Sequence, residues 1–199
     1  LAISPNAGKK YITNDTALIL AVHPIVNCCN VIELISISEE YGIPIIFDAV
    51  ESVHETYQEK RIGSFGVGEV FSFHASKLIN GMEGGYICTN DEHFSKCLKL
   101  FRDGDNNGIS SKMNDIHAML ALSSLTEIHH NVENNKSIYD QYKHLLSSIP
   151  YLRLLEFDES EQTSFKNIVI EIMDGSPLNR DTLLSFLNEK NILARPYYY

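Results

Sequence analysis

The chain has 199 residues, of which 44% are apolar and 21% are charged, the composition of an ordinary globular protein. Its formal net charge of -10 argues against nucleic-acid binding, because contact with a phosphate backbone needs clustered lysines and arginines. No apolar run approaches the roughly 20 residues of a membrane span, and the opening residues lack the pattern of a signal peptide.

Apolar runs in the first half of the chain predict strands. Thr16–His23 is nearly continuously apolar, which is typical of a strand that is covered on both faces of a sheet. Ile43–Val50 is a second such run, and its apolar part stops at Asp48. The runs Glu69–Lys77 and Gly84–Asn90 follow as further predicted strands.

Helical patterns alternate with these strands. Val31–Tyr41 follows Asn30, which is a favoured cap residue, and is ended by Gly42. We expect a second helix to be capped by Asn90 and to run to about Phe101. This order of elements predicts an α/β fold whose sheet is mostly parallel.

The pattern changes after Arg102–Gly108, whose glycine, asparagine and aspartate content predicts a loop. Residues Asn114–Ser148 are predicted to form one long helix or two consecutive helices. A strand over Phe165–Ile172 and a helix capped by Asn179 follow, and the closing segment Ile192–Tyr199 is apolar and strand-like.

These elements predict three parts. A partial large domain is expected over residues 1–113, a connecting long helix over 114–149, and a partial small domain of α+β type over 150–199. The chain begins shortly before a buried strand and stops in an apolar segment, so we expect it to be part of a longer protein.

The cysteines form neither a disulfide framework nor a C-x-x-C metal motif, which indicates a protein of the reducing cytoplasm. His129 and His130 are adjacent, so on a helix they point about 100° apart and are poor ligands for one ion. With no cluster at zinc-type spacing, we predict no metal site. The cysteines are Cys28, Cys29, Cys88 and Cys97.

Asp48 and Lys77 are the candidate functional pair. Ligands of open α/β sheets gather at the carboxyl ends of the strands, and both residues lie at or just beyond such an end. A carboxylate there is costly unless it meets a cation or donors, so one interpretation is a structural ion pair. The other is that Lys77 does chemistry in a pocket, which the small residues Ser72 and Gly81–Gly85 favour because they let a ligand approach the backbone.

Several segments agree jointly with one family. In order they are FDAVES, YQEKRIGSFG, VFSFHASK, EGGYICTND, KMNDIHAMLAL and, at the C-terminus, NILARPYYY. Together they resemble the sugar aminotransferases of the DegT/StrS group, which are fold-type I enzymes that use pyridoxal 5'-phosphate (PLP). The resemblance implies a three-layer α/β/α large domain, incomplete at its N-terminus, plus part of a small C-terminal α+β domain.

The resemblance also implies roles for individual residues. Lys77 would hold PLP as a Schiff base and shuttle a proton, Asp48 would pair with the pyridine nitrogen, and Ser72 would donate to the phosphate. Glu51 stands where relatives commonly carry a glutamine that contacts the 3'-oxygen of the ring. Ser110 stands where relatives extend an asparagine from the neighbouring subunit to the phosphate.

The implied reaction moves an amino group from glutamate to a keto sugar linked to a nucleotide, in nucleotide-sugar or surface-polysaccharide biosynthesis. The implied enzyme is a cytoplasmic homodimer. Two alternatives stay open. Some members dehydrate or rearrange their sugar, although these usually alter the lysine, whereas Lys77 is retained here. A relative without catalysis could also serve as an interaction module.

Other side chains have structural interpretations. His23, His54 and His74 are predicted to pack or to form hydrogen bonds and not to catalyse, and Glu83 is predicted to be a turn residue. The aromatic triplet Tyr197–Tyr199 either lines a sugar site or belongs to an apolar core.

Overall fold

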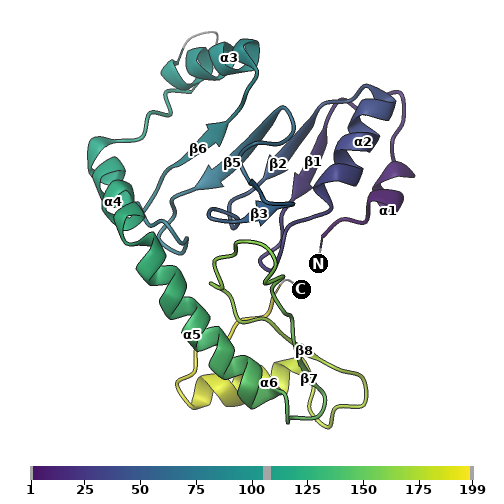
Figure 1. Cartoon of the computed structure of the whole chain (residues 1–199), viewed down its shortest axis with the longest axis vertical. Coiled ribbons are helices and arrows are strands. Elements are labelled where there is room, and N and C mark those ends of the chain that lie inside the picture. The colour runs from purple at the N-terminus through teal and green to yellow at the C-terminus, as the bar shows by residue number, and fades with distance from the viewer. Residues whose placement is uncertain (1, 105–108, 198–199) are drawn as a thin grey trace.

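The computed structural model describes residues 2–104 and 109–197, so the end of the predicted 102–108 loop and the tyrosines Tyr198 and Tyr199 lie outside the described residues. Figure 1 shows a sheet with its helices in the upper part, α4 and α5 descending along one side, and β7, β8 and α6 in the lower part. The elements are α1 (Pro5–Lys9), β1 (Ile19–Val22), α2 (Val31–Tyr41), β2 (Ile45–Asp48), β3 (Thr56–Tyr57), β4 (Lys60–Arg61), β5 (Gly68–Ser72), β6 (Gly85–Cys88), α3 (Glu92–Asp103), α4 (Asp115–Thr126), α5 (Ile128–Leu146), β7 (Leu152–Leu154), β8 (Ile170–Ile172) and α6 (Arg180–Glu189).

The main sheet has the strand order β1-β2-β5-β6. β1 is parallel to β2, and β2 is parallel to β5, so the carboxyl ends of these strands lie at one edge. β6 is antiparallel to β5, because the connection over 73–84 turns straight back instead of crossing over. The predicted parallel pairing therefore holds up to β5, and the sheet as a whole is mixed.

One face of this sheet is packed and the other is open. Ala21, Phe47 and Phe71 point to the packed face, where apolar side chains of α2 cover them. Leu20 and Val22 point to the opposite face, and they are 59% and 48% exposed. The prediction that the first strand is covered on both faces is wrong for the described residues, since only one face meets a helix.

Side-chain caps fix the starts of the helices. Asn30 accepts a hydrogen bond from the first turn of α2, and Gly42 ends this helix with a φ of 64°, as predicted. The predicted cap of α3 was wrong by one residue, since it is Asp91, and not Asn90, that accepts a hydrogen bond from the Phe94 N–H. α3 also runs beyond the predicted end, to Asp103.

The predicted strand Glu69–Lys77 ends early. Regular pairing stops at Ser72, and the Phe73 N–H then donates to the carbonyl of Gly84 at 2.8 Å, which closes the base of a loop. Lys77 lies inside this loop and not on a strand. An alternating apolar pattern cannot distinguish a strand from a loop whose apolar residues are buried for another reason.

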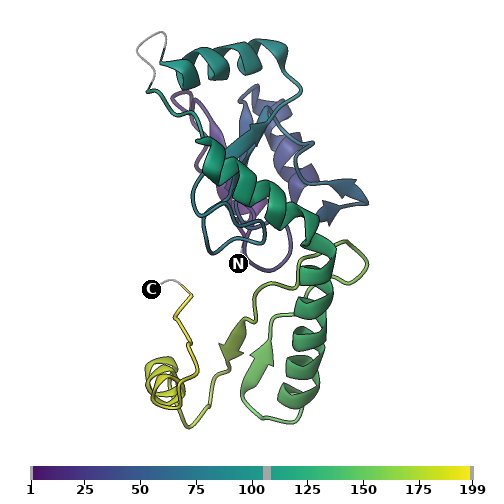
Figure 2. The ribbon, with the colours of Figure 1, turned by 90° about the vertical axis from the view of Figure 1, so that its left-hand side faces the viewer.

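Here that reason is a packing contact with the long helical region. Leu78 and Ile79, which follow Lys77, pack with Ala121 of α4 and Ile128 of α5. α4 and α5 are two consecutive helices joined at Glu127, one of the two predicted arrangements, and Figure 2 shows α5 continuing downward from α4. The helices therefore anchor the loop that carries Lys77.

A second apolar cluster joins the lower part of the molecule to the upper part. Its buried members are Val26, Tyr139, Phe157 and Phe165, and Val26 comes from the loop after β1. β7 and β8 pair antiparallel nearby, so that the strand predicted over 165–172 is reduced to its last residues. α6 begins at the predicted cap, Asn179.

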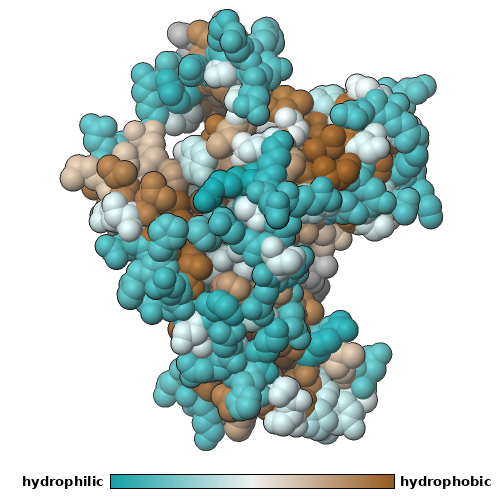
Figure 3. All heavy atoms as spheres, in the orientation of Figure 1, coloured by the Kyte–Doolittle hydropathy of each residue, from teal (hydrophilic) through white to brown (hydrophobic). Residues whose placement is uncertain are grey.

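Apolar side chains also remain at the surface. Figure 3 shows them gathered over α4, where the exposed residues include Ile116, Met119, Leu122 and Leu125. In the ranges that the structure describes, no helix is both long and apolar enough to cross a membrane.

The asymmetry of the sheet leads to a paired prediction. Phe47→Ala removes a fully buried ring and should lower the free energy of unfolding by about 3–5 kcal/mol. Leu20→Ala, on the exposed face, should change it by only about 0.5 kcal/mol. Urea unfolding followed by circular dichroism measures both, and equal losses would contradict the assignment of the two faces.

Candidate functional site

β2 and β5 bring Asp48 and Ser72 to the same edge and the same face of the sheet. The register pairs Asp48 with Val70, and Ser72 points to the same face as Val70 because side chains alternate along a strand. Opposite Ser72 stands Gly85, where a Cβ atom would lie 2.3 Å from the Phe71 carbonyl oxygen, so this position accepts only glycine. The two strands β5 and β6 are therefore closely packed at the backbone on this edge.

Asp48 is half-buried and only partly satisfied. Its Oδ1 accepts a hydrogen bond from the Val50 N–H at 3.1 Å, which fixes the carboxylate at the end of β2. Within the described part of the chain, Asp48 has no ion-pair partner. The structural ion pair with Lys77, one of the two interpretations from sequence, is thus not formed.

Lys77 instead pairs with Glu51, which lies in the turn that follows β2. The Lys77 Nζ donates to Glu51 Oε1, and the two side chains are only 13% and 18% exposed. The Lys77 N–H donates to the His74 carbonyl at 2.8 Å, so the backbone holds the lysine in a tight turn. The amine does face a carboxylate from the β2 end, although the residue is not the one expected.

Glu51 has a second cation partner. Lys166 Nζ donates to Glu51 Oε2 at 2.6 Å, and the Lys166 side chain is 19% exposed. Burial raises the pKa of Glu51, but the hydrogen bonds and charges of Lys166 and Lys77 outweigh burial and lower this pKa below its ordinary value. Glu51 is therefore an ionised carboxylate held between two ammonium groups.

Sequence analysis missed Lys166. The residue lies in FKNIVIEI, which reads as an apolar strand with one lysine, and such a lysine usually points to solvent. Lys166 and its partner Glu51 are 115 residues apart along the chain, so no local sequence pattern predicts their contact.

Ser110 is not brought to this edge. It is exposed and lies beside Gly104, the cap residue of α3, where a Cβ on the glycine would be 3.8 Å from the Ser110 nitrogen. In the described residues, no hydrogen bond or ion pair joins Ser110 to Asp48, Ser72 or Lys77.

A second buried carboxyl lies near Glu51. Glu55 is 3% exposed, and the Cys28 thiol donates to its Oε2 at 3.4 Å. Burial is the main cause that raises the pKa of Glu55 to about 7, and the charge of Glu51 adds to it, against the opposing hydrogen bond from Cys28. Burial also raises the pKa of the Cys28 thiol strongly. Below about pH 7 both groups hold their protons and add little negative charge to the site, whereas Glu55 ionises at higher pH.

The histidines make local contacts. His23 is buried and stacks on Phe47 at a centroid distance of 5.3 Å, and burial lowers its pKa to about 4. His74 Nδ1 lies 2.9 Å from the Ser76 hydroxyl, and His54 meets His129 edge to face.

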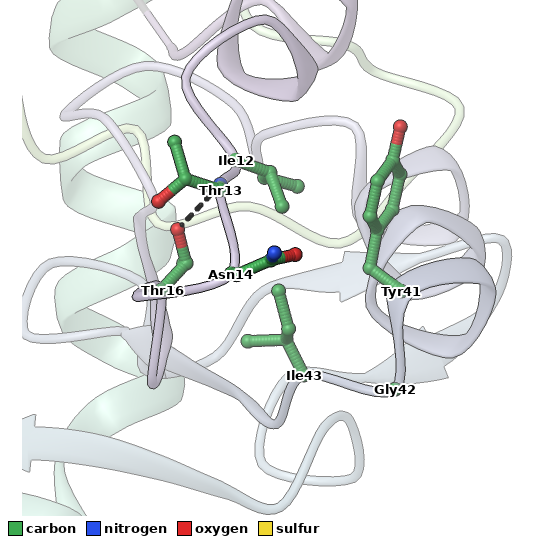
Figure 4. Close-up of a pocket in the computed structure, with 7 residues that line it drawn as sticks. All are labelled: Ile12, Thr13, Asn14, Thr16, Tyr41, Gly42 and Ile43. Atoms are coloured by element: carbon green, nitrogen blue, oxygen red, sulfur yellow. Dashed lines mark hydrogen bonds between the residues drawn. The ribbon is translucent and has the colours of Figure 1, made fainter.

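One pocket lies away from this edge. It has a volume of about 520 Å³ and is lined by Ile12, Thr13, Asn14, Thr16, Tyr41, Gly42 and Ile43 (Figure 4). In Figure 4 the Thr13 N–H donates to the Thr16 hydroxyl across one wall. These residues precede β1 and β2, so the pocket sits at the amino ends of the strands, opposite the edge where Asp48 and Lys77 lie. No group of metal-ligand side chains is present among the described residues.

The comparisons with known proteins agree with this geometry. A model of the DegT/DnrJ/EryC1/StrS aminotransferase family matches residues 1–199. The chain belongs to this family. The family predicted from the sequence motifs is thereby confirmed.

Three relatives illustrate the match. GDP-perosamine synthase of Vibrio cholerae is 26% identical over 212 residues, which are 100% of this chain and 57% of the relative. The solved structure of Helicobacter pylori PseC, an aminotransferase involved in the biosynthesis of pseudoaminic acid, has a TM-score of 0.91 at 25% identity, over 100% of this chain and 57% of that one. E. coli GDP-4-keto-6-deoxy-D-mannose-3-dehydratase with bound hydrated PLP has a TM-score of 0.82 at 23% identity, over 98% and 57%.

These structural likenesses confirm the predicted fold class, that of fold-type I PLP-dependent transferases. The chain spans about half the length of the relatives that it matches.

The raised pKa of Glu55 predicts how stability depends on pH. The folded chain holds this proton up to about pH 7, whereas an unfolded glutamate loses it near 4.5. The folded state therefore binds more protons between these values, and the contribution of Glu55 to stability falls as the pH rises. Glu55→Gln should match the wild type near pH 4 and be more stable by about 2–3 kcal/mol at pH 8. Urea unfolding at both pH values tests this, and a constant difference would contradict it.

Proposed function

We propose that this chain carries the lysine-bearing part of the active site of a PLP-dependent aminotransferase, which moves an amino group from glutamate to a nucleotide-linked keto sugar. The observation that carries the proposal is that Asp48 and Ser72 share one edge and one face of the sheet, while Lys77, in the loop after β5, reaches Glu51 just beyond Asp48. Family membership supports the reaction class, and the related GDP-perosamine synthases support the substrate class.

The chemistry of the side chains fits PLP. The Asp48 carboxylate keeps one oxygen without a hydrogen bond in the described residues, which suits a protonated pyridine nitrogen. Ser72 supplies a hydroxyl at the adjacent strand end, which suits a phosphate oxygen. Lys77 supplies a primary amine that suits the aldehyde.

Each of these residues has a distinct task. PLP, when bound, acts as the electron sink for the substrate carbon. Asp48 keeps the proton on the pyridine nitrogen, because a carboxylate next to a cation stabilises the charged form. Ser72 would donate its hydroxyl to the phosphate and so hold the phosphate at the edge of the sheet. Lys77 would hold the aldehyde end of the cofactor and, once the substrate's amine had released the Lys77 amine, would move a proton at the reacting carbon as a general base.

Glu51 would stand beside the 3'-oxygen of the ring. A carboxylate repels a phenolate-like oxygen unless a proton or a cation lies between them. Lys77 and Lys166 both contact Glu51, so positive charge is available at this position.

The proposal includes a homodimer in the cytoplasm. Among the described residues, Ser110 forms no hydrogen bond or ion pair with Asp48, Ser72 or Lys77, and in the proposed dimer it would reach the phosphate of a partner subunit. The exposed apolar residues of α4 suit such an interface. The thiols of this chain are unpaired, which suits a reducing compartment.

The first test maps the cofactor. Incubation with PLP followed by borohydride reduction should place a pyridoxyl group on Lys77, because its amine reaches the carboxyl end of β2 from the loop after β5. Peptide mass spectrometry identifies the modified residue. A loss of the adduct in Lys77→Ala, with an unchanged far-ultraviolet spectrum, completes the experiment, and labelling spread over surface lysines would argue for the non-catalytic interaction module.

The second test concerns Asp48. Asp48→Asn keeps an oxygen that accepts from the Val50 N–H, so the end of β2 should stay folded. The amide cannot stabilise a positive pyridine nitrogen, and the rate of 2-oxoglutarate formation from glutamate should fall about a hundredfold or more. Stopped-flow spectroscopy of this half-reaction measures the loss. A variant as fast as the wild type would remove Asp48 from its assigned role.

A further inference from the structure

The arrangement of Glu51 contains a feature that the aminotransferase reaction does not by itself require. Its carboxylate binds two ammonium groups, one from the loop after β5 and one from the segment between β7 and β8. All three side chains are less than one-fifth exposed. One carboxylate therefore pairs with two ammonium groups at a site that is largely shielded from water.

We propose that Lys166 is a positioning residue for the cofactor, which holds Glu51 ionised and in place while Lys77 is engaged with PLP. This inference rests on the proposed function. A Lys77 amine that joins the aldehyde can no longer donate freely to Glu51. Without a second cation, a buried carboxylate would then be left unpaired, which is among the most costly arrangements in a protein.

Lys166 is rigidly placed for this task. Its neighbour Phe165 is buried against Tyr139 and Phe157, and the Asn135 side chain donates to the Ser164 carbonyl at 3.0 Å. The ammonium group therefore approaches Glu51 from the segment that packs on α5, and not from the loop that carries Lys77.

Hydrogen bonds also tie the segment between β7 and β8, in the lower part of the molecule, to β3 near the site. Thr56 and Gln162 exchange hydrogen bonds, with the Thr56 N–H donating to the Gln162 carbonyl at 3.2 Å and the Gln162 N–H donating to the Thr56 hydroxyl at 2.9 Å. In Figure 1 the segment between β7 and β8 reaches up beside β3. Lys166 therefore contributes to cofactor binding from residues that sequence patterns assign to another part of the chain.

The test is a set of variants of the protein titrated with PLP. Lys166→Met should weaken PLP binding about 10- to 100-fold, because Glu51 must then give up its remaining cation. In the Glu51→Gln background the same change should cost less than about threefold, since an amide needs no cation. Absorbance titration gives the dissociation constants. Lys96→Met, which removes an exposed ion pair with Glu92 on α3, is the matched control and should bind PLP as the wild type does.

A spectroscopic signature separates positioning from packing. In Lys166→Met, the unbalanced Glu51 charge favours the protonated form of the cofactor attached to Lys77. The midpoint of the pH-dependent absorbance of bound PLP should therefore rise by about one pH unit, and it should return when Glu51→Gln is added. A lysine that only packs would leave this midpoint unchanged.

Each outcome decides the matter. Equal binding by Lys166→Met and the wild type, or a double variant that is as weak as Lys166→Met, overturns the proposal. If Lys166→Met fails to fold while the double variant folds and binds PLP, the charge coupling is supported, and if both fail to fold, Lys166 is a packing residue. If the wild type forms no adduct on Lys77, it is the proposed function that is wrong. In that case urea unfolding of the two single variants and the double variant still measures the coupling between Glu51 and Lys166 in the unliganded protein.

Discussion

Glu51 accepts hydrogen bonds from two lysines that are 26 and 115 residues away along the chain. A carboxylate in this position has lost most of its water, and only the two ammonium groups make its ionisation favourable, which is why its pKa is lowered in spite of burial. The other features of the site follow from this contact. It fixes the amine of Lys77 at the β2 edge, and it ties the segment between β7 and β8 to the sheet. A change of charge at Glu51 would therefore reach both halves of the chain.

The open face of the sheet is the second constraint. Asp48 and Ser72 point to the face on which Leu20 and Val22 are also exposed, while the opposite face is filled by α2 and the Phe47 and Phe71 rings. Polar groups at the carboxyl end of a parallel sheet can meet a ligand only where a helix does not cover them. The loop over 73–84 adds the lysine from the side, and it is held there by Leu78 and Ile79 against α4 and α5.

The sequence predicted the elements whose signals are local. The cap at Asn30, the left-handed Gly42 and the strand over Ile43–Val50 rest on residues within a few positions of one another, and they were right to within a residue or two. The errors have a common physical origin. The strand predicted to reach Lys77 stops at Ser72, because Leu78 and Ile79 owe their burial to helices that begin dozens of residues later. Lys166 was missed for the same reason: its partner lies in another segment, and only the folded chain brings the two together.

The contacts bear on both interpretations of Lys77, the structural one and the chemical one. If Lys77 has only a structural role, its ion pair with Glu51 explains why it is there. Glu51 is also paired with Lys166, so ion pairing that stabilises the fold is enough to explain these three residues. It does not account for Asp48 and Ser72, which stand on the adjacent strand ends with a half-buried carboxylate that has no cation. A half-buried carboxylate of this kind can accept a hydrogen bond from a cationic group of a ligand. The proposed role of Asp48 is therefore to meet a cationic group of a ligand, such as the ring nitrogen of PLP, and the proposed role of Lys166 is to keep Glu51 paired when the Lys77 amine is engaged with that ligand.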